Sequence, residues 1–142
     1  ELMDGEELGD QLVGARGRMQ MLGELLRDPK RCTLILVTIP ENMSVLETVR
    51  TLELLKGQGM PVTAVAVNMI QSPQPDCRFC HHRHESHMAQ LERIRDLVGD
   101  VELLTIEQEI DEPRGRAALT GLSAKIWMDR ERILRGEQST GH

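Results

Sequence analysis

The sequence predicts an α/β protein in which helices flank a parallel sheet. Three short apolar runs rich in β-branched residues, at 32–38, 62–68 and 101–106, are typical of strands that are buried on both faces. Segments with apolar residues at helical spacing separate these runs, and strands that are joined through helices pair in parallel. With 142 residues, the chain is long enough for one domain with its own core. The expected order is α-β-α-β-α-β-α.

The first helix is expected at 5–27, where apolar residues recur at helical spacing: Leu8, Leu12, Met19, Leu22 and Leu26. Four glycines inside this stretch, Gly9, Gly14, Gly17 and Gly23, each lower its stability by about 1 kcal/mol relative to alanine, and Asp28-Pro29 ends it. Met19 and Met21 would suit a surface for varied apolar partners. A stripe packed on the core is the favoured interpretation.

The second helix is expected at 43–56, with Ser44 as its N-cap and Glu47 completing a capping box. A third helical stripe, at 88–98, follows a cysteine–histidine segment that we expect to be a loop. The last helix is expected at 114–135, where it buries three residues: Leu119, Leu122 and Ile126.

The domain then comprises an amphipathic helix at 1–27, an α/β core at 28–135 and a polar tail at 136–142. A net charge of -6, with Phe79 and Trp127 as the only aromatic residues, argues against nucleic-acid binding. No apolar run approaches the ~20 residues that span a bilayer, and no signal-peptide pattern opens the chain. Three cysteines with one CxxC pair fit a reducing cytoplasm better than a disulfide framework.

The segment PDCRFCHHRHESH, residues 75–87, concentrates thiol and imidazole groups. Cys77 and Cys80 can converge on one ion, which is the common half of a structural zinc site. Within one chain, the remaining ligands would be two of three histidines: His81, His84 and His87. Thiol redox chemistry and a pair of purely structural cysteines are the alternatives, and metal binding is the favoured interpretation.

Three loops follow the predicted strands: IPEN at 39–42, NMIQSPQPDCRFC at 68–80 and EQEIDEPRG at 107–115. Ligands of parallel α/β sheets bind at the carboxyl ends of the strands, so these loops predict one functional edge. Asn68 ends the second strand. It either caps a turn or offers a ligand both the donor and the acceptor of its carboxamide.

The segment IPENMSVLETVR resembles the PE-x-x-S-x-x-ET-x-R segment of the anion-transporting ATPases. This family includes the arsenite-pump ATPase subunit and the ATPase that targets tail-anchored membrane proteins. VAVNMI is similar to the family's VVNQL strand end, and CRFCHHR to its C-x-x-C-x-x-R, with Arg83 at the arginine. EIDEPRG resembles the family's loop beside the nucleotide base, although Glu107 stands where the family has a proline.

The resemblance covers about residues 28–127 and implies that the sheet is part of a doubly wound fold of the P-loop NTPase type. It implies that ATP or ADP with Mg²⁺ is bound by the full-length protein and that Asn68 contacts the adenine ring. It places four further residues beside the base: Glu112, Pro113, Arg114 and Gly115.

The same resemblance implies a homodimer, in which Glu47 and Arg50 serve the subunit interface. It also implies that two chains each contribute Cys77 and Cys80 to a four-thiolate zinc site on the dimer axis. We favour this shared site over one closed within a single chain by two of its histidines, His84 and His87.

The sequence contains no G-x-x-x-x-G-K-[ST] motif, whose amides, lysine and hydroxyl hold the phosphates and Mg²⁺ in P-loop ATPases. The chain is therefore expected to be the C-terminal portion of such an ATPase and to be inactive in hydrolysis alone. The resemblance implies a cytoplasmic protein whose partners are a second copy and a membrane-protein client or transporter subunit. A non-enzymatic zinc-dependent dimerisation module and a thiol redox switch are the alternative functions.

Overall fold

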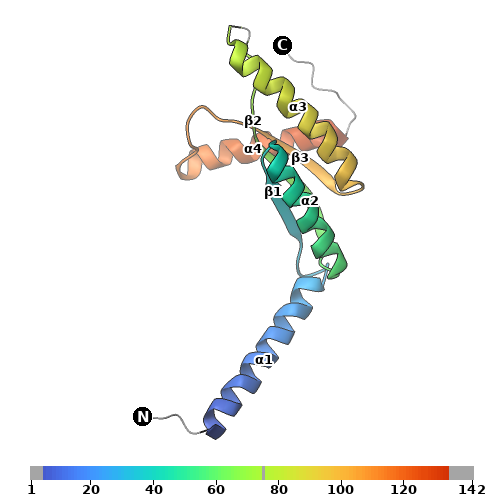
Figure 1. The fold of residues 1–142 in the computed structure, drawn as a ribbon. Coiled ribbons are helices and arrows are strands. Elements are labelled where there is room, and N and C mark those ends of the chain that lie inside the picture. Colours follow the sequence, from blue (N-terminus) through green and yellow to red (C-terminus); the bar gives the residue numbers. More distant parts are fainter. Residues whose placement is uncertain (1–4, 75, 135–142) are drawn as a thin grey trace.

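The computed structural model describes residues 5–74 and 76–134, with side chains at 9, 11–74 and 76–126. The predicted order of elements is confirmed: α1 (Gly5–Arg27), β1 (Leu34–Thr38), α2 (Asn42–Gly57), β2 (Val62–Ile70), α3 (Arg78–Val98), β3 (Glu102–Glu107) and α4 (Gly115–Leu134) (Figure 1). The predicted polar tail at 136–142 lies outside the described residues.

The three strands form a parallel sheet in the order β1-β2-β3, so β2 is central. Val65 pairs with Leu36 on one side and with Leu103 on the other. The pairing of β2 with β3 is regular up to Val67, and the register then shifts before Ile70. A second register shift lies between Leu34 and Ile35 at the start of β1, so the sheet is regular through the core and irregular toward both of its ends.

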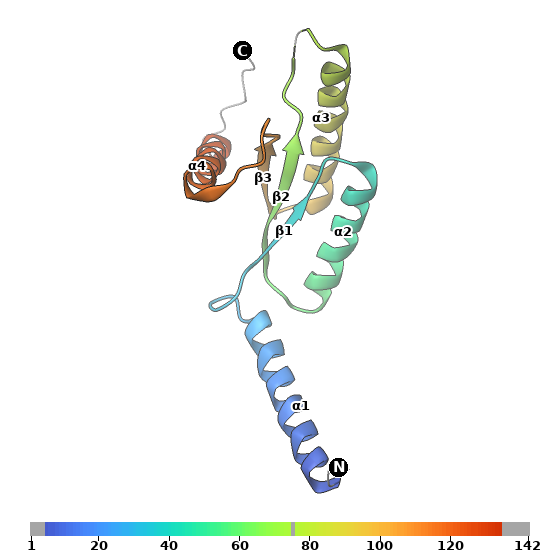
Figure 2. The same ribbon diagram turned by 90° about the vertical axis from the view of Figure 1, so that its left-hand side faces the viewer.

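The sheet separates two layers of helices, with α2 and α3 on one face and α4 on the other (Figure 2). The core lies on the first face, where Val65 and Val67 of β2 pack among side chains of α2 and α3: Val45, Leu52, Leu91, Ile94 and Val98. Each of these residues is at least nine-tenths buried. Burial of apolar area at about 25 cal/mol per Å² is the main stabilising contribution at this face.

The opposite face is covered unevenly. α4 packs on β3, while the side chains of Ile35 and Val37 on β1 remain 53% and 68% exposed. Leu119 of α4 is also exposed, which contradicts its predicted burial, whereas Leu122 and Ile126 are partly buried. α4 covers one edge strand, and this part of the fold leaves β1 with an open apolar face.

α1 extends away from the sheet and its helices (Figure 1). Met19 and Met21 are 71% and 69% exposed, so the prediction of a core stripe is wrong for the described residues. The helix is joined to the core at its end, where Arg27 Nε donates to the Gln58 carbonyl oxygen at 2.9 Å. No described helix is both long and apolar enough to cross a membrane.

The start of α2 differs from the predicted capping box. The helix begins at Asn42, with Glu41 as an N-cap that makes no side-chain capping hydrogen bond. Ser44 therefore lies inside the helix, where its carbonyl oxygen accepts from Thr48 Oγ1 at 2.7 Å. Glu47 pairs with Arg50 at 2.8 Å instead of reaching back to the helix start.

Candidate functional site at the carboxyl edge

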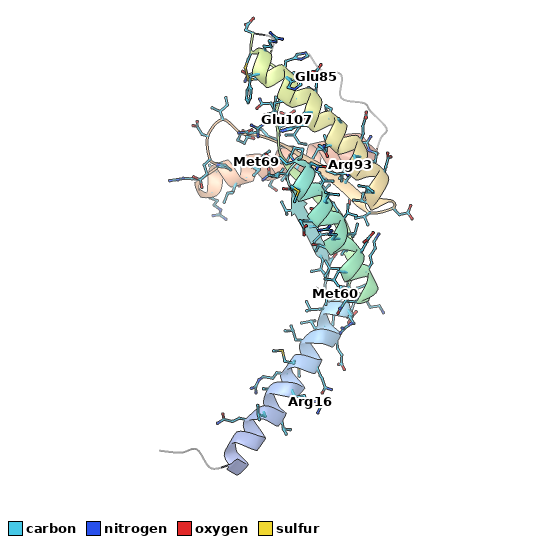
Figure 3. All side chains as sticks on the ribbon, viewed as in Figure 1. Arg16, Met60, Met69, Glu85, Arg93 and Glu107 are labelled. Atoms are coloured by element: carbon cyan, nitrogen blue, oxygen red, sulfur yellow. A yellow bond between two sulfur atoms is a disulfide. The ribbon has the colours of Figure 1, made fainter. Side chains whose placement is uncertain are left out.

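The carboxyl ends of the three strands place polar residues of distant segments at one edge of the molecule. Ile70 at the end of β2 pairs with Glu107 at the end of β3, and Met69 and Glu107 are labelled at this edge in Figure 3. The Gln108 amide donates to the Ile70 carbonyl oxygen at 2.8 Å. Ser72 Oγ donates to Glu107 Oε2 at 3.1 Å. Glu107, at the position of the family's proline, thus joins the loops after β2 and β3.

Asn68 stands at the irregular end of β2. The next residue, Met69, has a φ of 61° and is the one non-glycine residue with positive φ in the described chain. This left-handed conformation is costly for a residue with a Cβ. Asn68 Oδ1 accepts the Met69 amide at 2.9 Å, so the carboxamide supports the turn while its amino group stays available to a ligand.

Two histidines of α3 hold the backbone of Gln71. The Gln71 amide donates to His87 Nδ1 at 3.0 Å, and His84 Nδ1 lies 2.6 Å from the Gln71 carbonyl oxygen. Because a carbonyl oxygen only accepts, Nδ1 of His84 carries a proton. Nδ1 of His87 is unprotonated, since it accepts an amide hydrogen.

The surroundings of His87 favour its neutral form. The side chain is 4% exposed, and burial lowers its pKa below 6.5, helped by the nearby charges of Arg83 and His84 and opposed by Glu41. Arg83 Nε lies 3.4 Å from His87 Nε2. A neutral imidazole has one lone-pair nitrogen, and the shorter contact with the Gln71 amide assigns it to Nδ1.

Asn68 lines an open groove of about 390 Å³ together with the end of β1 and the first turns of α2. The α2 wall carries hydroxyl groups that are bonded within the helix, such as Thr48 to the Ser44 carbonyl oxygen at 2.7 Å. Glu47 also lines this groove. Its partner Arg50 has a 73% exposed side chain.

The other residues expected near the base lie in the loop between β3 and α4. Arg114 donates through Nε and Nη2 to Glu112 Oε2, at 2.9 and 2.6 Å, and both side chains are exposed. Pro113 is partly buried. Gly115 opens α4 with a φ of 75°, a conformation that glycine adopts without steric cost. Glu112 and Arg114 thus bind each other, and neither lines the groove that contains Asn68.

The CxxC pair lies at the start of α3. The helix begins at Arg78, so the prediction of a loop is wrong for most of the cysteine–histidine segment. Cys77 is the N-cap, and its Sγ accepts the Cys80 amide at 3.1 Å. The structure joins Cys77 and Cys80 as a disulfide with a Cα–Cα distance of 5.2 Å. Cys32, ahead of β1, is a partly buried free thiol.

The predicted metal ligands do not all meet. Cys77 and Cys80 are adjacent, whereas His84 and His87 turn their Nδ1 atoms to Gln71. In the described part of the chain, no three histidine, cysteine or acidic side chains are grouped to hold a metal ion. His81 and His82 instead lie 3.6 and 3.8 Å from the Glu85 carboxylate.

The class of protein follows from this arrangement. A parallel sheet whose strands are linked by helices on one face and covered by a further helix on the other (Figure 2), with polar loops at the carboxyl edge, is an α/β fold of the P-loop NTPase type. The family model for anion-transporting ATPases matches residues 3–128. The chain therefore belongs to the anion-transporting ATPase family.

Its relatives are named as ATPases. ATPase GET3B of Arabidopsis thaliana is 35% identical over 127 residues, which are 87% of this chain and 31% of the relative. ATPase GET3 of Chaetomium globosum is 27% identical over 122 residues, 84% of this chain and 36% of the relative. The ATPase ASNA1 homolog of Entamoeba histolytica is 31% identical over 104 residues, 73% of this chain and 32% of the relative. The chain thus spans about a third of the length of these curated relatives.

Proposed function

We propose that this chain supplies the adenine side of an ATP site and a zinc-binding half-site to an ATPase of the arsenite-pump or tail-anchored-targeting type. The targeting type is favoured because of the CxxC pair. The full-length protein would act in the cytoplasm as a homodimer, with ATP or ADP, Mg²⁺ and zinc as its cofactors. Its partner would be a membrane-protein client or a transporter subunit.

The position of Asn68 carries this proposal. It lies near the carboxyl end of the central strand, lines a groove at that edge and keeps its amino group free of the bond to Met69. A carboxamide in this setting can donate to a ring nitrogen of adenine. Glu112 and Arg114 lie in the neighbouring loop as an ion pair. Their approach to a bound base would require this pair to reorient.

The sulfur atoms at the start of α3 fit half of a zinc site. Cys77 and Cys80 converge at the start of the helix, where the amide of Cys80 donates to Cys77 Sγ. A structural zinc site takes four ligands in a tetrahedron. Bound zinc would tie the segments that supply its ligands to one another.

A four-thiolate site shared by two chains is favoured over one that is closed by histidines. When His87 Nδ1 accepts the Gln71 amide, Nε2 carries the proton and has no lone pair for a metal. A site closed by His84 and His87 would have to break that bond. Two-fold symmetry supplies two further thiolates without disturbing it.

The disulfide supports a second candidate, a thiol redox switch. Oxidation of Cys77 and Cys80 by glutathione disulfide would form the protein disulfide, break the glutathione S–S bond, and pass two electrons and two protons to glutathione as two thiols. The oxidised pair cannot bind zinc as two thiolates, so metal binding and oxidation would exclude each other. If the chain binds zinc but no nucleotide, its function would be that of a non-enzymatic, zinc-dependent dimerisation module.

The nucleotide part is tested by titrating the chain with ATP and with GTP, with calorimetric detection. Asn68→Asp keeps an oxygen for the Met69 amide but removes the amino donor, and we expect it to weaken ATP binding by about tenfold. Asn42→Asp, at the chain's other asparagine, is the control and should leave the affinity unchanged. Equal ATP affinity for Asn68→Asp and the wild type would contradict the proposal. No hydrolysis is expected from this chain, because it lacks the P-loop motif.

The zinc part is tested by elemental analysis together with the mass of the assembly, on reduced protein supplied with zinc. One ion per two chains supports the shared site, and one ion per chain supports the site closed by histidines. Cys77→Ser should abolish binding, and Cys32→Ser should retain it, because Cys32 lies ahead of β1, away from the pair. Zinc well below half an ion per chain would contradict both forms of the proposal.

A further inference from the structure

The turn that follows Asn68 is held from several sides. Met69 has a positive φ, and such a conformation persists only where the surrounding structure supports it. Asn68 Oδ1 binds the Met69 amide, and the Gln108 amide binds the Ile70 carbonyl oxygen. These contacts belong to the strand end and to the loop after β3.

The remaining contacts come from two histidines of α3, one of which accepts a hydrogen bond while the other donates one. His87 accepts from the Gln71 amide, and His84 donates to the Gln71 carbonyl oxygen. Both backbone groups of Gln71 are therefore satisfied by one face of one helix. The two histidines must adopt different tautomers for this, because the same atom, Nδ1, accepts in one and donates in the other.

We propose that His84 and His87 are positioning residues that hold the Gln71 backbone and thereby fix the turn that orients Asn68. Their effect on base binding rests on the proposed function, whereas their effect on the turn does not. Gln71 is separated from Asn68 by only the strained residue and Ile70, so a displacement of Gln71 reaches the carboxamide directly.

Burial and partners distinguish this pair from the other histidines of α3. His87 is almost fully buried and His84 is partly buried. His81 and His82 are exposed, with side chains 59% and 86% accessible, and face Glu85 on their own helix. A general effect of losing a histidine from this helix would appear at His82 as well.

The test uses substitutions that move the hydrogen-bonding atom. Asparagine places its amide at the position of Nδ1, and glutamine places its amide at the position of Nε2. His87→Asn should preserve the acceptor for Gln71, and His87→Gln should remove it. His84→Asn and His84→Gln form the matching pair for the donor. His82→Asn and His82→Gln are the controls.

Nuclear magnetic resonance tests directly for the two bonds from His84 and His87 to the Gln71 backbone, which we call the Gln71 clamp. We expect a ¹⁵N–¹⁵N coupling between the Gln71 amide and His87 Nδ1, slow exchange of the Gln71 amide, and changed Asn68 carboxamide signals in His87→Gln but not in His87→Asn. The exchange of the Gln71 amide should be at least about tenfold faster in His87→Gln, as expected for a lost bond of about 1.4 kcal/mol. Unchanged exchange in His87→Gln, or a proton on His87 Nδ1, would overturn the proposal.

If His87→Gln fails to fold, His84→Gln tests the other bond to Gln71, at a histidine that is only partly buried. A further substitution tests whether the turn couples His87 to Asn68. Met69→Gly adopts a positive φ freely, so in this background His87→Gln should no longer alter the Asn68 carboxamide signals. If it alters them as strongly as in the wild-type background, the turn is not the route of coupling and the proposal fails.

ATP titration then separates the two proposals. About fivefold weaker binding in His87→Gln, restored in His87→Asn, supports the positioning role. ATP binding that is equal in both variants overturns the effect on the base. If the wild type shows the bonds to Gln71 by magnetic resonance and yet binds no ATP, that result would contradict the proposed function, while the role of the two histidines in holding the turn would stand.

Discussion

Three side chains at the carboxyl edge of the sheet bind backbone amides. Asn68 binds the Met69 amide, Cys77 binds the Cys80 amide, and His87 binds the Gln71 amide. Each bond fixes one rotamer and satisfies a backbone donor that would otherwise cost about 1–3 kcal/mol when buried. At the scale of residues, the rotamers of these side chains at the carboxyl edge are therefore fixed before any ligand binds.

His87 predicts a pH dependence of stability. Its pKa in the folded chain is lowered from 6.5, so below this value the unfolded chain takes up a proton that the folded chain resists. The free energy of unfolding should fall as the pH drops from about 7.5 to about 5.5, across the ordinary histidine pKa. The measurement is urea unfolding across this range.

The contribution of His87 is isolated by comparison with His87→Asn, which does not titrate. The difference in unfolding free energy between the wild type and this variant should change with pH in the stated direction. His82→Asn, at a side chain that is 86% exposed, is the control for the loss of a histidine from α3. A flat difference for His87→Asn would contradict the lowered pKa.

At the scale of elements, α3 connects the other parts of the edge. Arg83 lies 3.6 Å from Glu41, and Arg93 donates to Asn42 at 2.6 Å, both at the start of α2. His84 and His87 bind the loop after β2, and Cys77 begins the helix. A structural change at the CxxC pair can therefore be transmitted through α3 to the loop after β1 and to the loop after β2.

α1 extends away from the sheet and its helices (Figure 1), so its stability should depend on the helix propensity of its own residues. Replacing one of its glycines should therefore have a measurable effect. Gly17 has no atom within 4 Å of an added Cβ, so Gly17→Ala should stabilise the helix locally by about 1 kcal/mol. Hydrogen exchange of α1 amides should slow by about fivefold, while amides of β2 stay unchanged. Gly121→Ala in α4, which is equally free of clashes, should leave α1 unaffected. Faster exchange in Gly17→Ala would contradict the described helix.

Elements with strong local patterns could be predicted from the sequence, and those that depend on distant contacts could not. The apolar runs at 62–68 and 101–106 mark β2 and β3 closely, because helices cover the two faces of these strands, which bury β2 and partly bury β3. The start of α3 cannot be predicted in this way, because cysteine is not a usual N-cap residue. The exposure of Met19 cannot be predicted either, because periodicity reveals an apolar stripe and not whether the described chain covers it.

The candidate site shows the same division. Asn68 could be singled out from its place at the end of a strand. The clamp on Gln71 had no signal in the sequence, since a histidine that binds a backbone group of a distant segment looks like any other. The pairing of Ser72 with Glu107 joins residues 35 positions apart and depends on the sheet that brings them together.

At the scale of the whole molecule, the open face of β1 predicts self-association. Ile35 and Val37 present apolar area on an edge strand, which is a common route to edge-to-edge pairing. Val37→Lys should reduce association in sedimentation velocity over a concentration series. It should change the unfolding free energy by less than about 0.5 kcal/mol, as an exposed substitution.

The control places the same charge on the other side of the sheet. Leu54 on α2 is 63% exposed, and Leu54→Lys should leave association unchanged. Equal effects of the two variants would indicate a general effect of charge instead of contact through β1.

The purely parallel sheet also has a consequence for the rate of folding. No two of its strands are joined by a hairpin, and partners such as Leu34 and Val62 are separated by the whole of α2. Each pairing must therefore close a long loop before any apolar contact across it compensates the lost chain entropy. β2 has to make two such closures, one on each side. We expect α1 to form within about a microsecond, as local helices do, and the sheet to appear much later in a single step that brings all three strands together.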